Sequence, residues 1–335
     1  MHGQFVWYEL MTTDSAGAQR FYPPITGWGT QKWDAPNTDY MMWTAGGETI
    51  AGIVQLTEAQ QSQGIRPNWL PYVAVDNVDQ TLAKATSLGA KVTMPPMDMP
   101  DVGRMAVIQD PQGAAIAVYR PSNAQPGFDG TPKLGNMCWH DLTTTDYSAA
   151  LSFYGAVFGW QKAGEMDMGG GMIYVMFGHG GKPYGGMYNR TPQMGNMPPN
   201  WVSYVNVRDV NAAVAAIKRG GGKVLQGPLP TPDGGLFAQA SDPQGTMFAL
   251  FQSPAQATEP AKKATQSKAK ASATAKSKPK KAKKAKASGK PKKKDKKKDK
   301  KKGKKKDKKK DKKKEKKKDK KKRKKKDKKR GKKKR

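Results

Sequence analysis

The residues best suited to chemistry in this chain are two carboxylates, each placed two positions after a tryptophan. Trp7 and Glu9 lie in one apolar stretch, and Trp139 and Asp141 lie in another. Side chains alternate between the two faces of a strand, so each tryptophan should share a face with its carboxylate. An indole beside a carboxylate suits a flat or cationic organic ligand, which it would bind by stacking and cation–π contact.

The two stretches belong to a long internal repeat. Residues 5–119 match residues 137–251 at an offset of 132, with a two-residue shift in the middle, where Tyr40 aligns with Tyr174. Such a repeat predicts two copies of one supersecondary unit packed about a pseudo-twofold axis, and we expect a site where they meet, built from both copies. The matched motifs are Thr13-Asp14 with Thr145-Asp146, Phe21-Tyr22 with Phe153-Tyr154, Gly27-Trp28 with Gly159-Trp160, and Asp110-Pro111-Gln112-Gly113 with Asp242-Pro243-Gln244-Gly245.

Each copy is predicted to alternate strands and helices. A strand over 5–11 leads to a helix capped by Asp14, which Pro23 and Pro24 should end; Asp146 should cap the matching helix over 149–158. Strands over 40–43, 50–56 and 70–75 follow, then a helix over 78–88 (matched by 210–219) and a final hairpin within 91–119. We therefore predict modules at 1–122 and 136–253, joined by a Pro/Gly-containing linker at 123–135.

The charge is divided between the modules and a tail at 254–335. Up to Ser253 there are 15 basic and 19 acidic residues, so the remaining 47 basic and 8 acidic residues belong to the tail. The tail has no apolar residue larger than alanine and is predicted to be disordered. Its Ala/Lys/Pro portion resembles lysine-rich tails of linker histones, and counterion release favours nucleic acid as its partner, or another polyanion such as polyphosphate or a membrane surface.

The remaining composition suggests a protein of a reducing compartment. Cys138 is the one cysteine, which excludes an internal disulfide, and no apolar run is long enough to span a bilayer. The chain starts without a basic and apolar leader. We therefore expect a cytoplasmic protein, which the tail would associate with the nucleoid.

The repeated motifs resemble those of the vicinal oxygen chelate superfamily, which includes glyoxalase I, extradiol dioxygenases and bleomycin-resistance proteins. The similarity rests on the strand leading into Thr-x-Asp, on Phe-Tyr, on Gly-Trp and on the late Asp-Pro-x-Gly, and it covers nearly all of residues 5–251. It implies an α+β fold: two tandem modules of βαβββ units, whose mixed sheets curl around a pocket.

The resemblance also implies where metal ligands would stand in metal-dependent relatives. Carried over by spacing, those positions hold Trp7 and Trp139, Ala117 and Ala249, and residues near Leu70, Val202, Gly52 and Gly186. None of these side chains can ligate a divalent ion, and the chain has only three histidines, His2, His140 and His179. We therefore expect no metal and no other cofactor.

Strand alternation selects the candidate ligand-binding residues. They are Trp7, Glu9, Tyr72, Tyr119, Trp139, Asp141, Tyr204, Asn206 and Phe251. They could equally be core residues that fill the space of a lost metal. His140 and Cys138 are expected to face the helices, as a structural histidine and a small buried thiol, and His179 should lie at an exposed hairpin tip.

Three functions remain open from the sequence. The first is metal-independent binding of a small organic ligand by a monomer with paired modules or by a homodimer. The second is a lyase or dioxygenase that uses Glu9, Asp141, His140 or His179, with an unrecognised metal or acid–base set. In the third, nucleic-acid binding by the tail is the function. We favour the first and third, which are compatible; catalytic residues are not identified.

Overall fold

A computed structural model describes residues 1–34, 39–123, 127, 131 and 133–254. The described residues belong to one compact unit of the chain. The predicted tail, apart from Pro254, and parts of the predicted linker lie outside the described residues. Among the described residues, no helix has the length and apolarity needed to cross a bilayer.

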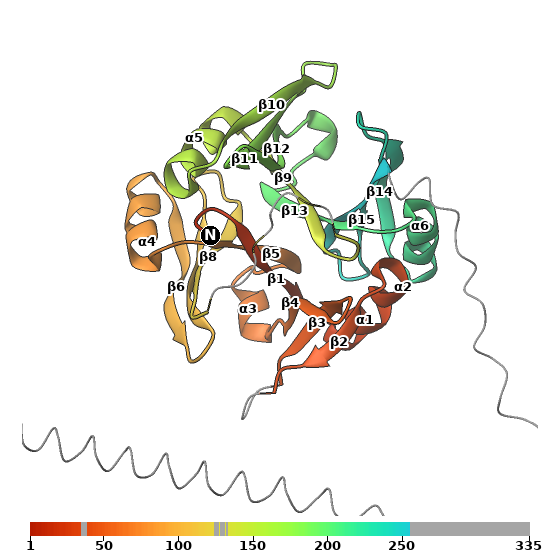
Figure 1. Cartoon of the computed structure of the whole chain (residues 1–335), viewed down its shortest axis with the longest axis horizontal. Helices are drawn as coiled ribbons and strands as arrows, with labels where there is room; N and C mark the ends of the chain where they lie inside the picture. Colours follow the sequence, from red (N-terminus) through yellow and green to blue (C-terminus); the bar gives the residue numbers. More distant parts are fainter. Residues whose placement is uncertain (35–38, 124–126, 128–130, 132, 255–335) are drawn as a thin grey trace, which may run out of the picture. The chain divides into compact units, whose positions relative to one another are not determined.

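The first module folds into one mixed sheet, in the order β2-β3-β4-β1-β5-β8-β7-β6 (Figure 1). Its elements are β1 (Phe5–Thr12), α1 (Ser15–Phe21), α2 (Pro23–Thr26), β2 (Gly29–Lys32), β3 (Met41–Ala45), β4 (Glu48–Gln55), α3 (Glu58–Ser62), β5 (Asn68–Ala74), α4 (Val78–Ser87), β6 (Lys91–Met99), β7 (Gly103–Gln109) and β8 (Ala115–Pro121).

The second module repeats this topology in its own sheet, in the order β10-β11-β12-β9-β13-β16-β15-β14. Its elements are β9 (Met137–Thr144), α5 (Tyr147–Phe158), β10 (Gln161–Asp167), β11 (Ile173–His179), β12 (Lys182–Asn189), the 3-10 helix η1 (Pro192–Met194), β13 (Asn200–Asn206), α6 (Val210–Arg219), β14 (Lys223–Pro230), β15 (Leu236–Ser241) and β16 (Met247–Gln252). The predicted tandem modules of βαβββ units are therefore confirmed.

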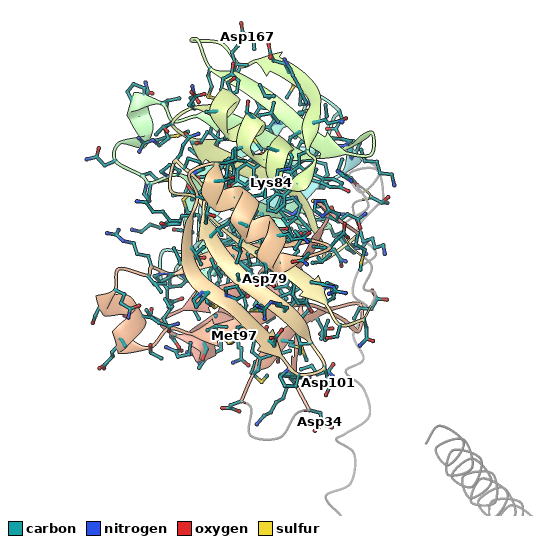
Figure 2. All side chains as sticks on the ribbon, turned by 90° about the vertical axis from the view of Figure 1, so that its left-hand side faces the viewer. Asp34, Asp79, Lys84, Met97, Asp101 and Asp167 are labelled. Carbon is teal, nitrogen blue, oxygen red and sulfur yellow. The ribbon has the colours of Figure 1, made fainter. Side chains whose placement is uncertain are left out.

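Each sheet combines two βαβββ halves through its central strands. In the first module, β1 runs parallel to β4 and antiparallel to β5, and β5 runs parallel to β8. The helices cover one face; Figure 2 shows α4, with Asp79 and Lys84 labelled, across the strands of the second half. The other face, which we call the inner face, is lined by a separate apolar cluster in each module.

Side-chain caps fix where the longer helices begin. Asp14 Oδ1 accepts a hydrogen bond from Gly17 N at 2.7 Å, and Asp146 Oδ1 accepts from Ser148 N and Ala149 N. The predicted interruption at Pro23 is observed, but Pro23 opens the short helix α2 because proline is favoured in a first turn.

Reciprocal contacts join the two modules. Tyr22 donates to Asp242 Oδ2 at 3.1 Å, and Tyr154 donates to Asp110 Oδ2 at 3.0 Å. Likewise, Trp28 Nε1 donates to Gly135 O and Trp160 Nε1 donates to Gly3 O. In each pair of bonds, the donor and acceptor of one bond are the repeat counterparts, 132 positions away, of those in the other. The same contact is thus made in both directions, as the expected pseudo-twofold axis requires.

Buried aromatic rings fill the junction between the modules. Phe5 stacks on His140 with ring centroids 3.7 Å apart, and Tyr8, the repeat counterpart of His140, lies 2.6 Å from His140 Nε2 through its hydroxyl. Phe5 and Tyr8 belong to one core cluster shared by both modules, and His140 is buried beside them. The expected site built from both copies at this junction is therefore wrong: the space is core, and the predicted site residues lie on the two inner faces.

Candidate ligand-binding site

The predicted residues of the first module gather on its inner face. Trp7 pairs with Tyr72 across β1 and β5, and Tyr72 pairs with Ala117 on β8. Trp7, Tyr72 and Tyr119 contact one apolar cluster with Leu70 and Met105. Because Glu9 follows Trp7 by two positions in the same strand, its side chain lies on this face.

Glu9 is held by two phenols. Tyr40 donates to Glu9 Oε1 at 2.8 Å and Tyr72 donates to Glu9 Oε2 at 2.5 Å, while Trp7 Nε1 donates to the Tyr40 hydroxyl at 3.3 Å. Both carboxylate oxygens thus have a donor and keep further lone pairs for another one. Tyr119 is turned away from Glu9, because its hydroxyl donates to Val102 O at 2.9 Å.

The second module builds the same centre around an aspartate. Tyr174 donates to Asp141 Oδ1 and Tyr204 donates to Asp141 Oδ2, each at 2.6 Å. Trp139 Nε1 donates to the Tyr174 hydroxyl at 2.6 Å and to Asp141 Oδ1 at 3.1 Å. Phe251 packs against the same inner-face cluster. The structure thus assembles the predicted Trp, acid and Tyr residues separately in each half.

Sequence reasoning missed Tyr40 and Tyr174 as site residues. Each lies over a glycine, and a Cβ on Gly52 or Gly186 would overlap the phenol. Gly52 pairs with Glu9 across β4 and β1, and Gly186 pairs with Asp141 in the same way. The available signal was a tyrosine repeated in both copies, paired with a repeated glycine that leaves room for it.

Burial shifts the pKa of both carboxyls. It raises the pKa of Glu9, against the opposing hydrogen bonds from Tyr72 and Tyr40. It raises the pKa of Asp141 to about 6, against hydrogen bonds from Tyr174, Tyr204 and Trp139. Burial also raises the pKa of Tyr72, and the neighbouring Glu9 adds to the rise. The phenol therefore stays protonated and acts as a hydrogen-bond donor to Glu9.

The donor set on each inner face does not fit a divalent metal ion. One carboxylate stands among neutral phenols that donate to it, and the nearest cross-strand positions are Gly52 and Leu70 in one module and Gly186 and Val202 in the other. Zinc and the dioxygenase metals require several imidazole or carboxylate ligands. Within the described ranges, no group of three His, Cys, Asp or Glu residues could hold a metal ion.

The histidines lie away from both carboxylates. His140 is buried in the junction, where its Nδ1 lies 2.9 Å from Tyr184 O and burial lowers its pKa to about 3. His179 Nδ1 lies 3.3 Å from Gly159 O at the end of β11. The expectation that His140 faces away from the pocket is confirmed.

Cys138 contradicts its predicted direction. It packs with Trp139, Val202 and Tyr204 in the inner-face cluster instead of facing the helices. The reason is a β-bulge: the pairing of β9 with β13 shifts between Tyr204 and Val205, and the extra residue breaks the alternation. Burial raises the pKa of the thiol, so Cys138 is an inert buried residue.

Asn206 differs from the other predicted residues. It is completely buried and pairs with Phe251 across β13 and β16, while neither its Oδ1 nor its Nδ2 has a hydrogen-bond partner within the described part of the chain. Its counterpart in the first module is Ala74. Buried side-chain amides nearly always have hydrogen-bond partners, so an asparagine at this position should lower the stability of the fold.

Two mixed sheets of βαβββ halves, each with a carboxylate on its inner face, place the chain among proteins built from tandem βαβββ modules. The family model "Glyoxalase/Bleomycin resistance protein/Dioxygenase superfamily" matches residues 4–118 and 137–250. The chain therefore belongs to this superfamily, which the sequence motifs had indicated.

Similar proteins extend over both modules. A protein of Mycobacterium tuberculosis named "Putative glyoxylase CFP32" is 35% identical over 248 residues, covering 73% of this chain and 93% of its own. The "Anthracycline biosynthesis protein DnrV" of Streptomyces peucetius is 29% identical over 262 residues, covering 75% and 93%. Among solved structures, the 2,3-dioxygenase LapB from Pseudomonas sp. KL28 shares the fold, with a TM-score of 0.53, 12% identity, and coverage of 74% of this chain and 91% of that one.

Proposed function

We propose that this protein binds a small, flat organic ligand on the inner face of a module, without a metal. The observation that supports it most is the repeated centre in which two phenols and an indole surround one carboxylate, as around Glu9. The aromatic rings supply stacking area, and the carboxylate has lone pairs left for a hydroxyl or amine on the ligand. Two relatives are named for the biosynthesis of anthracyclines, which are built on flat fused rings.

The donor set argues for binding over the metal-dependent chemistry of other superfamily members. Catalysis by a Lewis acid needs ligands that hold the ion, and each inner face offers a single carboxylate. The raised pKa of Asp141 would allow a proton-transfer role, but His140 and His179 lie elsewhere and supply no second acid or base.

Native mass spectrometry of the protein taken from its own cells tests this proposal directly. We expect one or more bound organic molecules and no stoichiometric metal. In parallel, the purified full-length chain is titrated with 1,4-dihydroxyanthraquinone, with and without EDTA, by isothermal calorimetry. Unchanged affinity in EDTA supports the proposal. Loss of binding in EDTA, restored by added Mn²⁺ or Fe²⁺, would contradict it.

We propose in addition that the lysine-rich tail binds nucleic acid without sequence preference and so associates the protein with the nucleoid. The support is its charge, 47 basic against 8 acidic residues, beside a module region with 15 and 19. Lysines that neutralise phosphates release counterions, which makes binding steeply salt-dependent.

The salt dependence of DNA binding tests the role of the tail. With the full-length chain and duplexes of unrelated sequence, log K should fall linearly with log salt, by roughly 10³-fold or more between 50 and 200 mM NaCl. Equal affinities for the duplexes are expected. Binding that persists at high salt, or that selects one sequence, would contradict a purely electrostatic tail.

A further inference from the structure

The two inner faces share their carboxylate centre but differ in the residues around it. At five positions that correspond through the repeat, the first module has only apolar side chains, whereas the second has four polar side chains and a phenylalanine. In the order first and second module, these positions are Met11 and Thr143, Val54 and Tyr188, Met94 and Gln226, Val107 and Gln239, and Met105 and Phe237.

In the second module the polar residues close around the centre. Thr143 Oγ1 donates to the Tyr188 hydroxyl at 2.9 Å, and Gln239 Nε2 donates to the Tyr204 hydroxyl at 2.9 Å. Thr143, Tyr188 and Asp141 are all buried, and Asp141 is only 4% exposed. A ligand that displaced these side chains from around Asp141 would cost them buried hydrogen bonds.

In the first module the same positions leave the centre accessible. Glu9 and Met11 are partly exposed, whereas their counterparts Asp141 and Thr143 are buried. The two tryptophans, Trp7 and Trp139, are both partly exposed. Val107 stands where Gln239 would donate to the phenol. The Tyr72 hydroxyl donates to Glu9, and among the described residues its other polar neighbour is Met105 Sδ, at 4.0 Å. The first module therefore lacks the two additional hydrogen bonds, from Thr143 and from Gln239, that the second module makes beside its carboxylate.

Methionines give this face an adaptable lining. Met11, Met94, Met99 and Met105 all contact its apolar cluster. Methionine is flexible and polarizable, fits irregular shapes and makes favourable contacts with aromatic rings. A recess of about 390 Å³ lies at the hairpin of β6 and β7 and the end of β8. Met99 and Gly103 line it together with charged side chains, among them Asp98, Arg104 and Arg120. Figure 2 labels Met97 and Asp101 on this hairpin.

We propose that the first module is the ligand-binding half and that the second is its structural counterpart. This inference rests on the proposed function. The ligand class is a neutral, flat aromatic molecule with a hydroxyl or N–H at its edge: the methionines and Trp7 contact the rings, and Glu9 accepts the edge hydrogen bond. One ligand binds per chain. Because the methionine side chains can adjust their conformations, the site accepts a series of related ring systems.

Calorimetric titration with 1,4-dihydroxyanthraquinone tests this, because the probe is neutral and so avoids strong attraction to the cationic tail. The variant Met11→Thr with Val107→Gln gives the first module two of the five polar or aromatic residues of the second, and we expect at least a tenfold loss of affinity. The matched control is Thr143→Met with Gln239→Val, which makes the reverse change. It should keep wild-type affinity within twofold, with thermal unfolding recorded for both variants.

A second measurement needs no substitution in the measured protein. The chain contains 17 methionines, whose methyl groups can be labelled with ¹³C and observed by NMR in the full-length protein. On adding the probe, we expect shifts of Met11, Met94, Met99 and Met105, identified through single Met→Leu variants. Met247, which contacts the inner-face cluster of the second module, should not move.

The outcomes separate this inference from the proposed function. Stoichiometry of one, loss in the first-module variant and shifts of the first-module methionines support it. Stoichiometry of two, loss in the second-module variant or a shift of Met247 overturns the assignment while leaving ligand binding intact. Absence of probe binding to the wild-type chain overturns both.

Discussion

Replacing Tyr154 by phenylalanine should weaken the joint between the modules. The Tyr154 hydroxyl donates to Asp110 Oδ2 at 3.0 Å and accepts from Trp201 Nε1 at 3.2 Å. The other oxygen, Asp110 Oδ1, accepts from three backbone amides of the Asp-Pro-Gln-Gly turn and its following residue. Phenylalanine keeps the ring and removes only the hydroxyl, so the change isolates this link between α5 and the turn.

The expected loss of stability depends on the two buried groups, Asp110 and Trp201, that would lose their hydrogen-bond partner. Asp110 and Trp201 are 3% and 5% exposed, so water cannot replace the lost hydroxyl. Each buried group without a partner costs about 1–3 kcal/mol, and we expect a total loss of about 3 kcal/mol. For a folded region of this size that lowers Tm by roughly 6–12 °C. Tyr22→Phe, which removes the reciprocal bond to Asp242, should cost a similar amount.

Urea unfolding of the full-length chain, followed by tryptophan fluorescence, measures the effect as a shift in midpoint at constant slope. Tyr147→Phe is the matched control on the same helix, because the Tyr147 hydroxyl makes no hydrogen bond within the described residues; it should cost less than about 0.5 kcal/mol. If Tyr154→Phe costs no more than this control, the hydroxyl does not hold the modules together and the reasoning fails.

Three further predictions concern the inner faces. Asp141→Asn should change the pH dependence of stability: a pKa raised from 3.8 to about 6 means that the folded state binds the proton more tightly, so wild-type stability should fall by about 2 kcal/mol more than that of the variant between pH 4 and pH 7. If urea titrations show the same change in the free energy of unfolding for the wild type and the variant between pH 4 and pH 7, this prediction is contradicted. Asn206→Ala, which installs the first-module residue, should raise stability by about 1 kcal/mol because it removes a buried amide that has no hydrogen-bond partner among the described residues, and a lower Tm would show that the amide is satisfied. Gly52→Ala should cost about 1–3 kcal/mol by pushing Tyr40 from Glu9, and an unchanged Tm would show that Tyr40 moves freely.

The sequence predicted the fold well because the same motifs occur twice in register. Alternation along the strands predicted that Trp7, Tyr72 and Tyr204 share an inward face, and their cross-strand pairs agree with this. Alternation failed at Cys138, because a bulge is a local exception that apolar periodicity does not reveal. The module boundaries, set at 122 and 136, are consistent with strands that end at Pro121 and begin at Met137.

The candidate site could be predicted only in part. The alignment of Tyr40 with Tyr174 was visible, but nothing in the sequence shows that each phenol reaches a carboxylate 31 or 33 positions earlier. That contact depends on cross-strand pairing and on the space above Gly52 and Gly186. The expected site between the copies was wrong because the junction is where the aromatic side chains of both modules are buried.

The exchange of hydrogen bonds between the copies has an evolutionary consequence. In a homodimer, one mutation alters both subunits at once, so the two faces must remain alike. Here the partners are encoded separately along a single chain, and the reciprocal bonds of Tyr22 and Tyr154 keep them assembled while each drifts independently. Fusion of this kind lets one half specialise in recognition while its twin is retained as scaffolding.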